Sequence, residues 1–308
     1  MLSHSDWTRR SCPICGSSEI IRKPVGKSAR PAEKLSFLEV KDSFVGLRSE
    51  QIFFSYFRCK NCSLLYCPWY FNSTQLDELY RDMPDNLMGE DKSTISKTQS
   101  GYVNWLSKHL SGVRNYLEIG PDIGLVTRAV VERYGVYSAL LVEPNVAVHQ
   151  DLGKSASDVK AVEIVKYLQD SKMLDFDLVV GVHVYDHLLN PTKDLLDIKS
   201  RCEEGAKLLI VVHNEKSLLR TLLGKKWPPF CLQHPQLYNP ATLEELLRNS
   251  GWKLEAIGKS TNWWRLNHFF ELGLKVLGLP DRFARFLPKF EIPFKLGNTI
   301  ALATKIND

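Results

Sequence analysis

The sequence predicts an α/β protein with a doubly wound, mostly parallel seven-stranded sheet and a small cysteine-rich domain before it. Three observations carry this prediction. From residue 115 onward apolar strands alternate with helical stretches, as in successive βαβ units. Two Cys-x-x-Cys pairs stand within residues 1–75. A glycine turn and then an acidic residue follow the first two predicted strands.

Length and composition fit one α/β domain with a smaller unit attached. The chain has 308 residues, of which 44% are hydrophobic and 24% charged, proportions typical of a globular protein. No apolar run reaches the roughly 18 residues of a membrane span. The N-terminus lacks the apolar core of a signal peptide, and we therefore expect a cytoplasmic protein.

The distribution of charged residues along the chain indicates which kinds of binding partner to expect. The net charge is +5, and residues 1–75 hold 11 Lys+Arg against 6 Asp+Glu, so the surplus lies in this segment. It is spread out, without the dense basic stripe of a nucleic-acid footprint. We expect a small-molecule substrate rather than nucleic acid or a membrane, and nothing in the sequence predicts the oligomeric state.

Each element of the sheet is expected from apolar runs and turn signals. The predicted strands are 115–120, 138–143, 159–164, 176–182, 206–212, 252–258 and 298–306. The helices between them are 125–135, one from Asn145, one from Pro191 and 241–251. The organisation that follows is a module over 1–75, a helical linker or cap over 76–110 with a polar link at 83–100, and an α/β domain over 111–308 with a helical insertion at about 265–288.

The two cysteine pairs predict a structural zinc site. Cys12 and Cys15 form one Cys-x-x-Cys turn and Cys59 and Cys62 the other. Each turn points two thiolates at one ion, and the two turns complete a tetrahedral Cys₄ site with no position left for water. Cys67 is expected to be a core residue.

The glycine turn predicts a cofactor site at the carboxyl edge of the sheet. Gly120 and Gly124 follow the first strand, where glycine lets the backbone approach a ligand closely. The dinucleotide fingerprint G-x-G-x-x-G is not met, because Pro121 and Asp122 follow Gly120, and NAD is therefore disfavoured. Glu143 ends the second strand, where a carboxylate can accept both hydroxyls of a ribose.

Taken together, these motifs resemble a known family. LEIGPDIG, LLVEPN, DFDLVVGVHVYDHLLNP and GAKLLIVVHN resemble class I S-adenosylmethionine (SAM)-dependent methyltransferases, with their Rossmann-like fold, in order and spacing. The cysteine pairs with LLYCPWYFNSTQLDELY resemble the zinc-binding module of sugar methyltransferases. The resemblance implies SAM as cofactor. The residues expected at it are Glu118, Gly120, Asp122, Gly124, Glu143 and His183.

The same resemblance implies where an acceptor would react. His187 follows the fourth strand and is the first candidate for a catalytic base, with structural packing as the alternative. His234 is the second candidate, and Asp186 would orient either imidazole. Residues 224–247 resemble a substrate lid in which Lys225 and Lys226 meet either a phosphate or solvent. An apolar wall is expected there from Trp227, Phe230 and Tyr238.

We therefore expect SAM-dependent transfer of a methyl group to oxygen or carbon of a small molecule, with a sugar or nucleotide-linked sugar as the favoured acceptor. Two alternatives stay open. One is a degenerate SAM-binding or interaction protein, favoured by Asp122 and by the absence of a clear acid for the adenine after the third strand. The other is a zinc-guided methyltransferase acting on RNA or protein.

Overall fold

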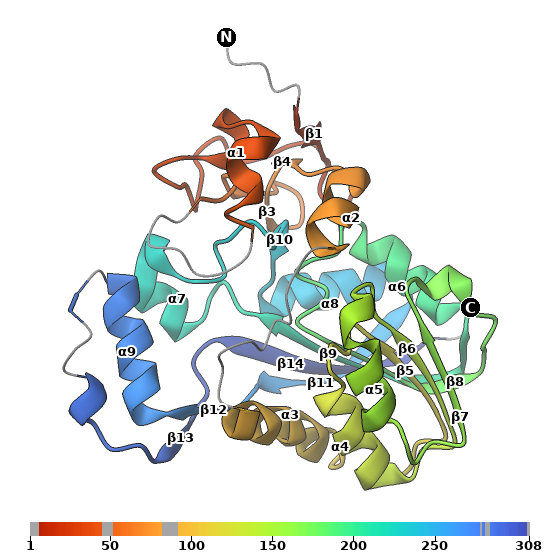
Figure 1. Ribbon diagram of the computed structural model, residues 1–308. Helices are drawn as coiled ribbons and strands as arrows, with labels where there is room; N and C mark the ends of the chain where they lie inside the picture. The colour runs from red at the N-terminus through yellow and green to blue at the C-terminus, as the bar shows by residue number, and fades with distance from the viewer. Residues whose placement is uncertain (1–5, 45–51, 82–91, 278, 281–283, 307–308) are drawn as a thin grey trace.

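The structure is a computed structural model that describes residues 6–44, 52–81, 92–277, 279–280 and 284–306 (Figure 1). Its centre is a single seven-stranded sheet. The strands are β5 (Asn115–Ile119), β6 (Ser138–Val142), β7 (Ala161–Val165), β8 (Phe176–Val182), β9 (Cys202–His213), β11 (Trp252–Lys259) and β14 (Asn298–Lys305). Their order in the sheet is β11-β14-β9-β8-β5-β6-β7.

This sheet confirms the predicted seven-stranded, mostly parallel arrangement. The five strands from β7 to β9 run parallel to one another, and β14 lies antiparallel between β9 and β11. The winding reverses at β5, which has β6 on one side and β8 on the other. In open α/β sheets ligands bind at the carboxyl ends of the strands beside such a switch point. The fold therefore places a candidate site at the ends of β5, β6 and β8.

Helices cover both faces of the sheet. Side chains of α3 (Lys92–Leu106), α4 (Leu125–Tyr134) and α5 (His149–Ser155) pack on one face, and those of α6 (Pro191–Lys199) and α8 (Pro240–Asn249) pack on the other. Local signals set the helix ends. Gly135 ends α4 in the left-handed conformation at φ 65°, and the Asn239 side chain caps α8 just before Pro240. The result is a three-layer α/β/α sandwich.

The N-terminal module, here the described part of residues 6–81, packs above β10 and α7 in the view of Figure 1. Its short elements and the two next to it are β1 (Thr8–Arg9), α1 (Phe37–Lys41), β2 (Phe57–Arg58), β3 (Leu65–Tyr66), β4 (Trp69–Tyr70), α2 (Ser73–Arg81), α7 (Leu218–Leu223) and β10 (Gln236–Leu237). The strand β10 pairs with β3, in a three-stranded sheet ordered β10-β3-β2. One strand of this small sheet thus comes from the second half of the chain.

That pairing corrects the expected lid. Trp227 and Phe230 are each 1% exposed and belong to the core of the N-terminal module, where the Phe230 ring stacks on Phe53 at 5.5 Å. Tyr238 is fully buried, and its hydroxyl donates to the carbonyl of Tyr185. These aromatic residues are buried where the module meets the sheet, and the Trp227 ring lies 6.4 Å from that of His213.

One further expectation changes. At the predicted insertion of about 265–288, the described residues form the helix α9 (Leu266–Leu277) and a 3₁₀ turn at Ala284–Phe286, framed by the hairpin of β12 (Asn262–Arg265) and β13 (Glu291–Phe294). The polar link expected at 83–100 is helical from Lys92 on, because α3 begins there, and 83–91 lies outside the described residues. Among the helices of the described residues, none has the length and apolar character to cross a membrane.

Candidate functional site

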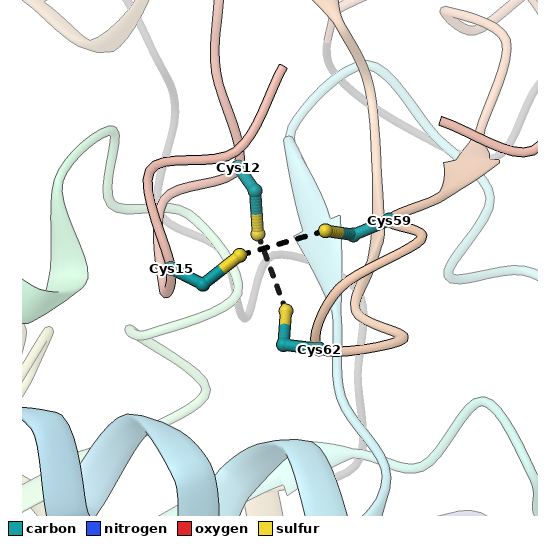
Figure 2. A group of neighbouring side chains, drawn as sticks. All are labelled: Cys12, Cys15, Cys59 and Cys62. Carbon is teal, nitrogen blue, oxygen red and sulfur yellow. Dashed lines mark hydrogen bonds between the residues drawn. The ribbon is translucent and has the colours of Figure 1, made fainter. Parts of the chain in front are cut away.

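The four paired cysteines converge on one point in the N-terminal module (Figure 2). The sulfurs of Cys12 and Cys62 lie 3.4 Å apart, those of Cys15 and Cys59 lie 3.5 Å apart, and all four fall within 4.8 Å of one another. A disulfide would need about 2.05 Å. Zn–S bonds of about 2.3 Å in a tetrahedron give sulfur separations of about 3.8 Å. The cluster therefore has the donor set and size of a tetrahedral metal site.

The backbone of each turn supports thiolate ligands. Amide groups of Ile14 and Cys15 are directed at the Cys12 sulfur, and the corresponding amides of Asn61 and Cys62 at the Cys59 sulfur. Amide donors stabilise a sulfur that carries negative charge. Two sequence-distant turns thus present the same geometry to one point.

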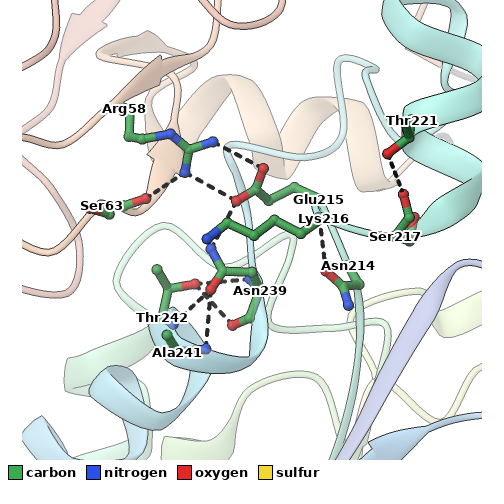
Figure 3. Close-up of polar contacts among 10 residues, drawn as sticks. All are labelled: Arg58, Ser63, Asn214, Glu215, Lys216, Ser217, Thr221, Asn239, Ala241 and Thr242. Atoms are coloured by element: carbon green, nitrogen blue, oxygen red, sulfur yellow. Dashed lines mark hydrogen bonds and ion pairs between the residues drawn. The ribbon is translucent and has the colours of Figure 1, made fainter.

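An ion pair joins the cysteine turn to the loop after β9 (Figure 3). Arg58, next to Cys59, donates from two nitrogens to the two carboxylate oxygens of Glu215, at 3.0 Å each. The Glu215 side chain is only 4% exposed, and it also accepts from the Asn239 amide at 2.8 Å. A bidentate Arg–carboxylate pair fixes both orientation and distance. The cysteine turn, the end of β9 and the start of α8 are therefore held together.

The predicted glycine turn follows β5. Gly120, Asp122 and Gly124 all have left-handed backbones, at φ 65°, 53° and 78°. A Cβ at Gly120 would lie 2.6 Å from a methyl group of Val184, and one at Gly124 would lie 2.7 Å from side chains of α5. Neighbouring protein therefore requires both glycines, whereas Asp122 holds a conformation that is strained for a residue with a side chain.

The two acidic residues of this region differ in what they contact. Glu118 is 2% exposed and accepts hydrogen bonds from the hydroxyls of Tyr116 and Thr127, so its carboxylate points into the layer under α4. Burial raises the pKa of Glu118 to about 7. Glu143, 8% exposed, accepts from the backbone amides of Asp122 at 2.9 Å and Asn145 at 2.8 Å. Glu143 thus closes the glycine turn.

Four histidines gather beside this turn, at the carboxyl ends of β8 and β9; we call His183, His187, His213 and His234 the histidine cluster. His183 follows β8 in a left-handed conformation at φ 54°, and its ring stacks on His213 at 4.4 Å. Asn298 at the start of β14 contacts both rings: its oxygen lies 3.0 Å from Nδ1 of His213 and its nitrogen 3.3 Å from Nε2 of His183. One amide thus fixes the tautomers of two imidazoles.

The other two histidines differ in charge. Burial, reinforced by His234 and His183, lowers the pKa of His187 well below its usual value, and its Nδ1 lies 3.0 Å from the hydroxyl of Tyr80 on α2. Although burial opposes it, the neighbouring Cys231 side chain raises the pKa of His234 to about 9, while the pKa of the Cys231 thiol is itself lowered. The two atoms of that pair, Cys231 Sγ and His234 Nδ1, lie 3.3 Å apart. At neutral pH His187 is neutral and His234 is a cation.

The cluster brings together some predicted residues and adds others. His187 and His234 meet edge to face at 4.6 Å. Asp186, expected to orient one of them, instead accepts from the backbone amide of His213 at 3.1 Å. Sequence reasoning did not single out His213. It also missed Asn298 and Tyr80, whose only signal was their position at the edge of a predicted element.

His183, Asp186 and His213 form a second group whose possible ligand atoms lie within 4.8 Å of one another. An imidazole binds a metal along its nitrogen lone pair, which lies in the plane of the ring. The rings of His183 and His213 are stacked with an interplanar angle of only 27°, so their lone pairs do not converge on one ion. The geometry of this group therefore does not favour metal binding.

Comparison with solved structures finds the same fold. The complex between the Haloferax volcanii Trm112 methyltransferase activator and a methyltransferase matches with TM-score 0.51 at 12% identity, over 70% of this chain and 93% of that chain. The N-methyltransferase NodS of Bradyrhizobium japonicum in complex with S-adenosyl-L-homocysteine gives TM-score 0.49 at 12% identity, over 76% and 98% of the two chains. The N,N-8-amino-8-demethyl-D-riboflavin dimethyltransferase RosA of Streptomyces davawensis matches with TM-score 0.47 at 15% identity, over 70% of this chain and 56% of that chain.

Sequence comparison gives the family. No curated protein shows significant similarity to this chain. Residues 74–257, however, match the family described as "Methyltransferase domain". This stretch is more than half of the chain and contains the glycine turn, Glu143 and all of the histidine cluster. The chain therefore belongs to the methyltransferase-domain family and is a SAM-dependent methyltransferase.

Proposed function

We propose that this enzyme methylates oxygen or carbon of a small molecule of the sugar class, with SAM at the ends of β5 and β6 and the acceptor at the histidine cluster. One observation carries the proposal. Val184, between His183 and His187 in sequence, reaches the space above Gly120, where an added Cβ would lie 2.6 Å from it. The glycine turn therefore packs against the loop that carries His183 and His187, which would place a donor site beside an acceptor site.

The residues proposed to hold SAM fit its chemistry. The Glu143 carboxylate has about four acceptor positions, and backbone amides use two of them, which leaves two for a ribose diol. Gly120, Asp122 and Gly124 form the turn beside it, and His183 lies at the reacting end. Glu118 would contribute to the cofactor site without touching SAM, by fixing the side chains of Tyr116 and Thr127 through hydrogen bonds. When bound, SAM supplies an activated methyl group, so the chain has to align the acceptor and accept one proton.

The base proposed for that proton is His187. Its lowered pKa keeps it neutral at pH 7, and a hydrogen bond from its Nδ1 to the oxygen of Tyr80 would leave the lone pair on Nε2. His234, as a cation 4.6 Å away, favours neutral His187 and would stabilise negative charge that develops on the acceptor. Asp186 would act through the backbone of His213.

Zinc is proposed as the ion of the cysteine cluster. The four sulfurs are a soft donor set with no room for a water ligand, which fits a structural rather than a catalytic metal. In this position zinc would fix the turn that carries Arg58 and, through it, Glu215. Its role would be to hold the N-terminal module against the loop after β9 and the start of α8.

The test is turnover. Purified protein is incubated with SAM and a panel of sugars, sugar phosphates and nucleotide sugars, and products are examined for a methyl mass gain. With an active acceptor, His187→Ala should lose roughly 10²–10⁴-fold in kcat while calorimetric affinity for S-adenosylhomocysteine stays unchanged. Glu143→Ala should instead weaken that affinity by about 1.5–3 kcal/mol. Cofactor binding without transfer to any member of the panel would contradict the proposed acceptor class.

A further inference from the structure

A hollow outside the proposed active site lies between α3 and the carboxyl end of β11. It is a cavity of about 170 Å³. Residues from three separate segments line it: Gly101, Tyr102, Asn104, Trp105 and Lys108 on and after α3, Lys259, Ser260 and Thr261 at the end of β11, and Lys295 and Ile300 around the start of β14. We call it the lysine cavity.

Its electrostatics favour an anion. Lys108, Lys259 and Lys295 converge from three segments, and no Asp or Glu is among the lining residues. None of the three lysines takes part in an ion pair between described residues. A lone surface lysine is ordinarily just solvated. Three around one concavity, with the polar side chains of Asn104 and Thr261 beside them, concentrate positive potential at a single point.

Tyr102, which lines the lysine cavity, also contacts the residue that holds two rings of the histidine cluster. Burial raises the pKa of Tyr102 to about 12, so the phenol keeps its proton, and its hydroxyl interacts with the side chains of Ser260, Asn262 and Asn298. Asn298 is the residue that contacts both His183 and His213. The lysine cavity and the residues proposed to receive the acceptor are therefore neighbours that share the contact between Tyr102 and Asn298.

We propose that the lysine cavity binds a phosphate or diphosphate group of the methyl acceptor, whose reacting part extends toward the histidine cluster. The inference rests on the proposed function and narrows its substrate class to phosphorylated molecules. Size agrees with it: sites that enclose a whole drug-sized ligand measure about 300–1,000 Å³, and 170 Å³ holds only the anionic group. Lys225 and Lys226, which the sequence suggested for such a role, are not among the lining residues.

The first experiment measures binding without turnover. Inorganic pyrophosphate is titrated into the intact protein by calorimetry, and the Lys259→Ala, Lys295→Ala double variant is compared with wild type. Charge-assisted hydrogen bonds to phosphate are strong, and we expect affinity to fall at least tenfold. Lys253→Ala is the control, since Lys253 is an exposed lysine at the other end of β11, about 20 Å from Lys259. Equal losses in both variants, or no binding to wild type, would overturn the inference.

The second experiment separates a group on the acceptor from a free anion. For an acceptor that is methylated, KM is compared between its phosphorylated and unphosphorylated forms in wild type and in the double variant. We expect the variant to raise KM at least tenfold for the phosphorylated form only, and pyrophosphate to compete with it. Binding of pyrophosphate without competition would identify a separate anion site and overturn the acceptor assignment.

These arms also distinguish the inference from the proposed function. If no sugar-class acceptor is methylated but pyrophosphate binding depends on Lys259 and Lys295, the acceptor class is wrong and the anion site stands. If sugars are methylated while neither lysine affects binding or KM, the function stands and the lysine cavity is not its phosphate site.

Discussion

The two halves of the proposed site are built in opposite ways. The cofactor half, residues 118–143, is a single stretch of chain: strand, glycine turn, helix and strand. The histidine half draws its residues from the ends of β8, β9 and β14 and from the 231–238 segment, with Tyr80 added from α2. The first is held by local backbone geometry, whereas the second exists only after distant segments have packed.

The difference identifies what each half depends on. Left-handed glycines and two backbone hydrogen bonds to Glu143 shape the cofactor half. The histidine half depends on the N-terminal module, since the hydroxyl of Tyr56 donates to the carbonyl of His234 and β10 pairs with β3. Damage to the module should therefore reach the histidine cluster before it reaches the glycine turn.

The largest expected effect comes from Cys59→Ser. Structural zinc contributes on the order of 10 kcal/mol to folding of small zinc domains, so loss of one ligand should unfold the module. Hydrogen exchange followed by mass spectrometry should show protection lost over 53–71 and 227–238. Residues 115–142 should stay protected, because the cofactor half makes its own hydrogen bonds.

Cys202→Ser provides the control for that variant. Cys202 is 5% exposed in β9 and donates to the carbonyl of Ile198, away from the cysteine cluster. It should leave both the zinc content and the exchange pattern unchanged. Uniform loss of protection across both halves in Cys59→Ser would show that the halves fold as one unit, against the comparison drawn above.

Arg58→Ala should have the next largest effect. It leaves the Glu215 carboxylate, 4% exposed, without its cation, and removal of one partner of a buried pair costs about 3–5 kcal/mol. Lys60→Ala is the control two residues away, because its pair with Glu19 is 56% and 71% exposed and should contribute at most about 1 kcal/mol. Urea unfolding measures both. Similar small losses would mean that Arg58 does not couple the module to the sheet.

The same contrast explains how far the sequence could predict the molecule. All seven sheet strands lie where apolar runs place them. For the parallel strands β5, β6 and β8 the signal is strong because they are buried on both faces of the sheet. The meeting of His213 with Asn298 depends on antiparallel pairing of β14 with β9, which places the two residues opposite each other. Nothing in either strand specifies that partner. The two-residue strand β10 gives no pattern, since its pairing with β3 spans most of the chain.

A smaller effect is expected within the cofactor half. Gly124→Ala introduces a Cβ at 2.7 Å from atoms of Leu152 and Ser155, whereas Gly135→Ala, also left-handed, meets nothing within 4 Å. Backbone strain alone costs roughly 1–2 kcal/mol, and overpacking adds about 1–3 kcal/mol in the first variant. The difference in unfolding free energy between Gly124→Ala and Gly135→Ala therefore measures the cost of the clash with α5. Equal values would show that packing against α5 does not require glycine at position 124.

The smallest and most diagnostic effect is the pH dependence of stability, in which the halves oppose each other. Burial raises the pKa of Glu118 to about 7. Its contribution to the free energy of unfolding is therefore full below about pH 4.5 and is lost as the pH rises toward 7. His187 and His213 have pKa values lowered by burial, so their contribution is full above about pH 6.5 and is lost as the pH falls. Between pH 4.5 and 6.5 the unfolding free energy falls with pH because of Glu118 and rises with pH because of the two histidines, so the two effects partly cancel.

Glu118→Gln should remove the titration of Glu118 from the pH dependence of stability. The glutamine side-chain oxygen should still accept hydrogen bonds from Tyr116 and Thr127. Over that interval the unfolding free energy of the variant should rise with pH more steeply than that of wild type. The added slope is at most about 1.4 kcal/mol per pH unit, the value for one proton. Urea unfolding at pH 5.0, 5.5, 6.0 and 6.5 measures it. Parallel curves would mean that Glu118 titrates alike in the folded and unfolded chains, and that the cofactor half does not hold a protonated carboxyl.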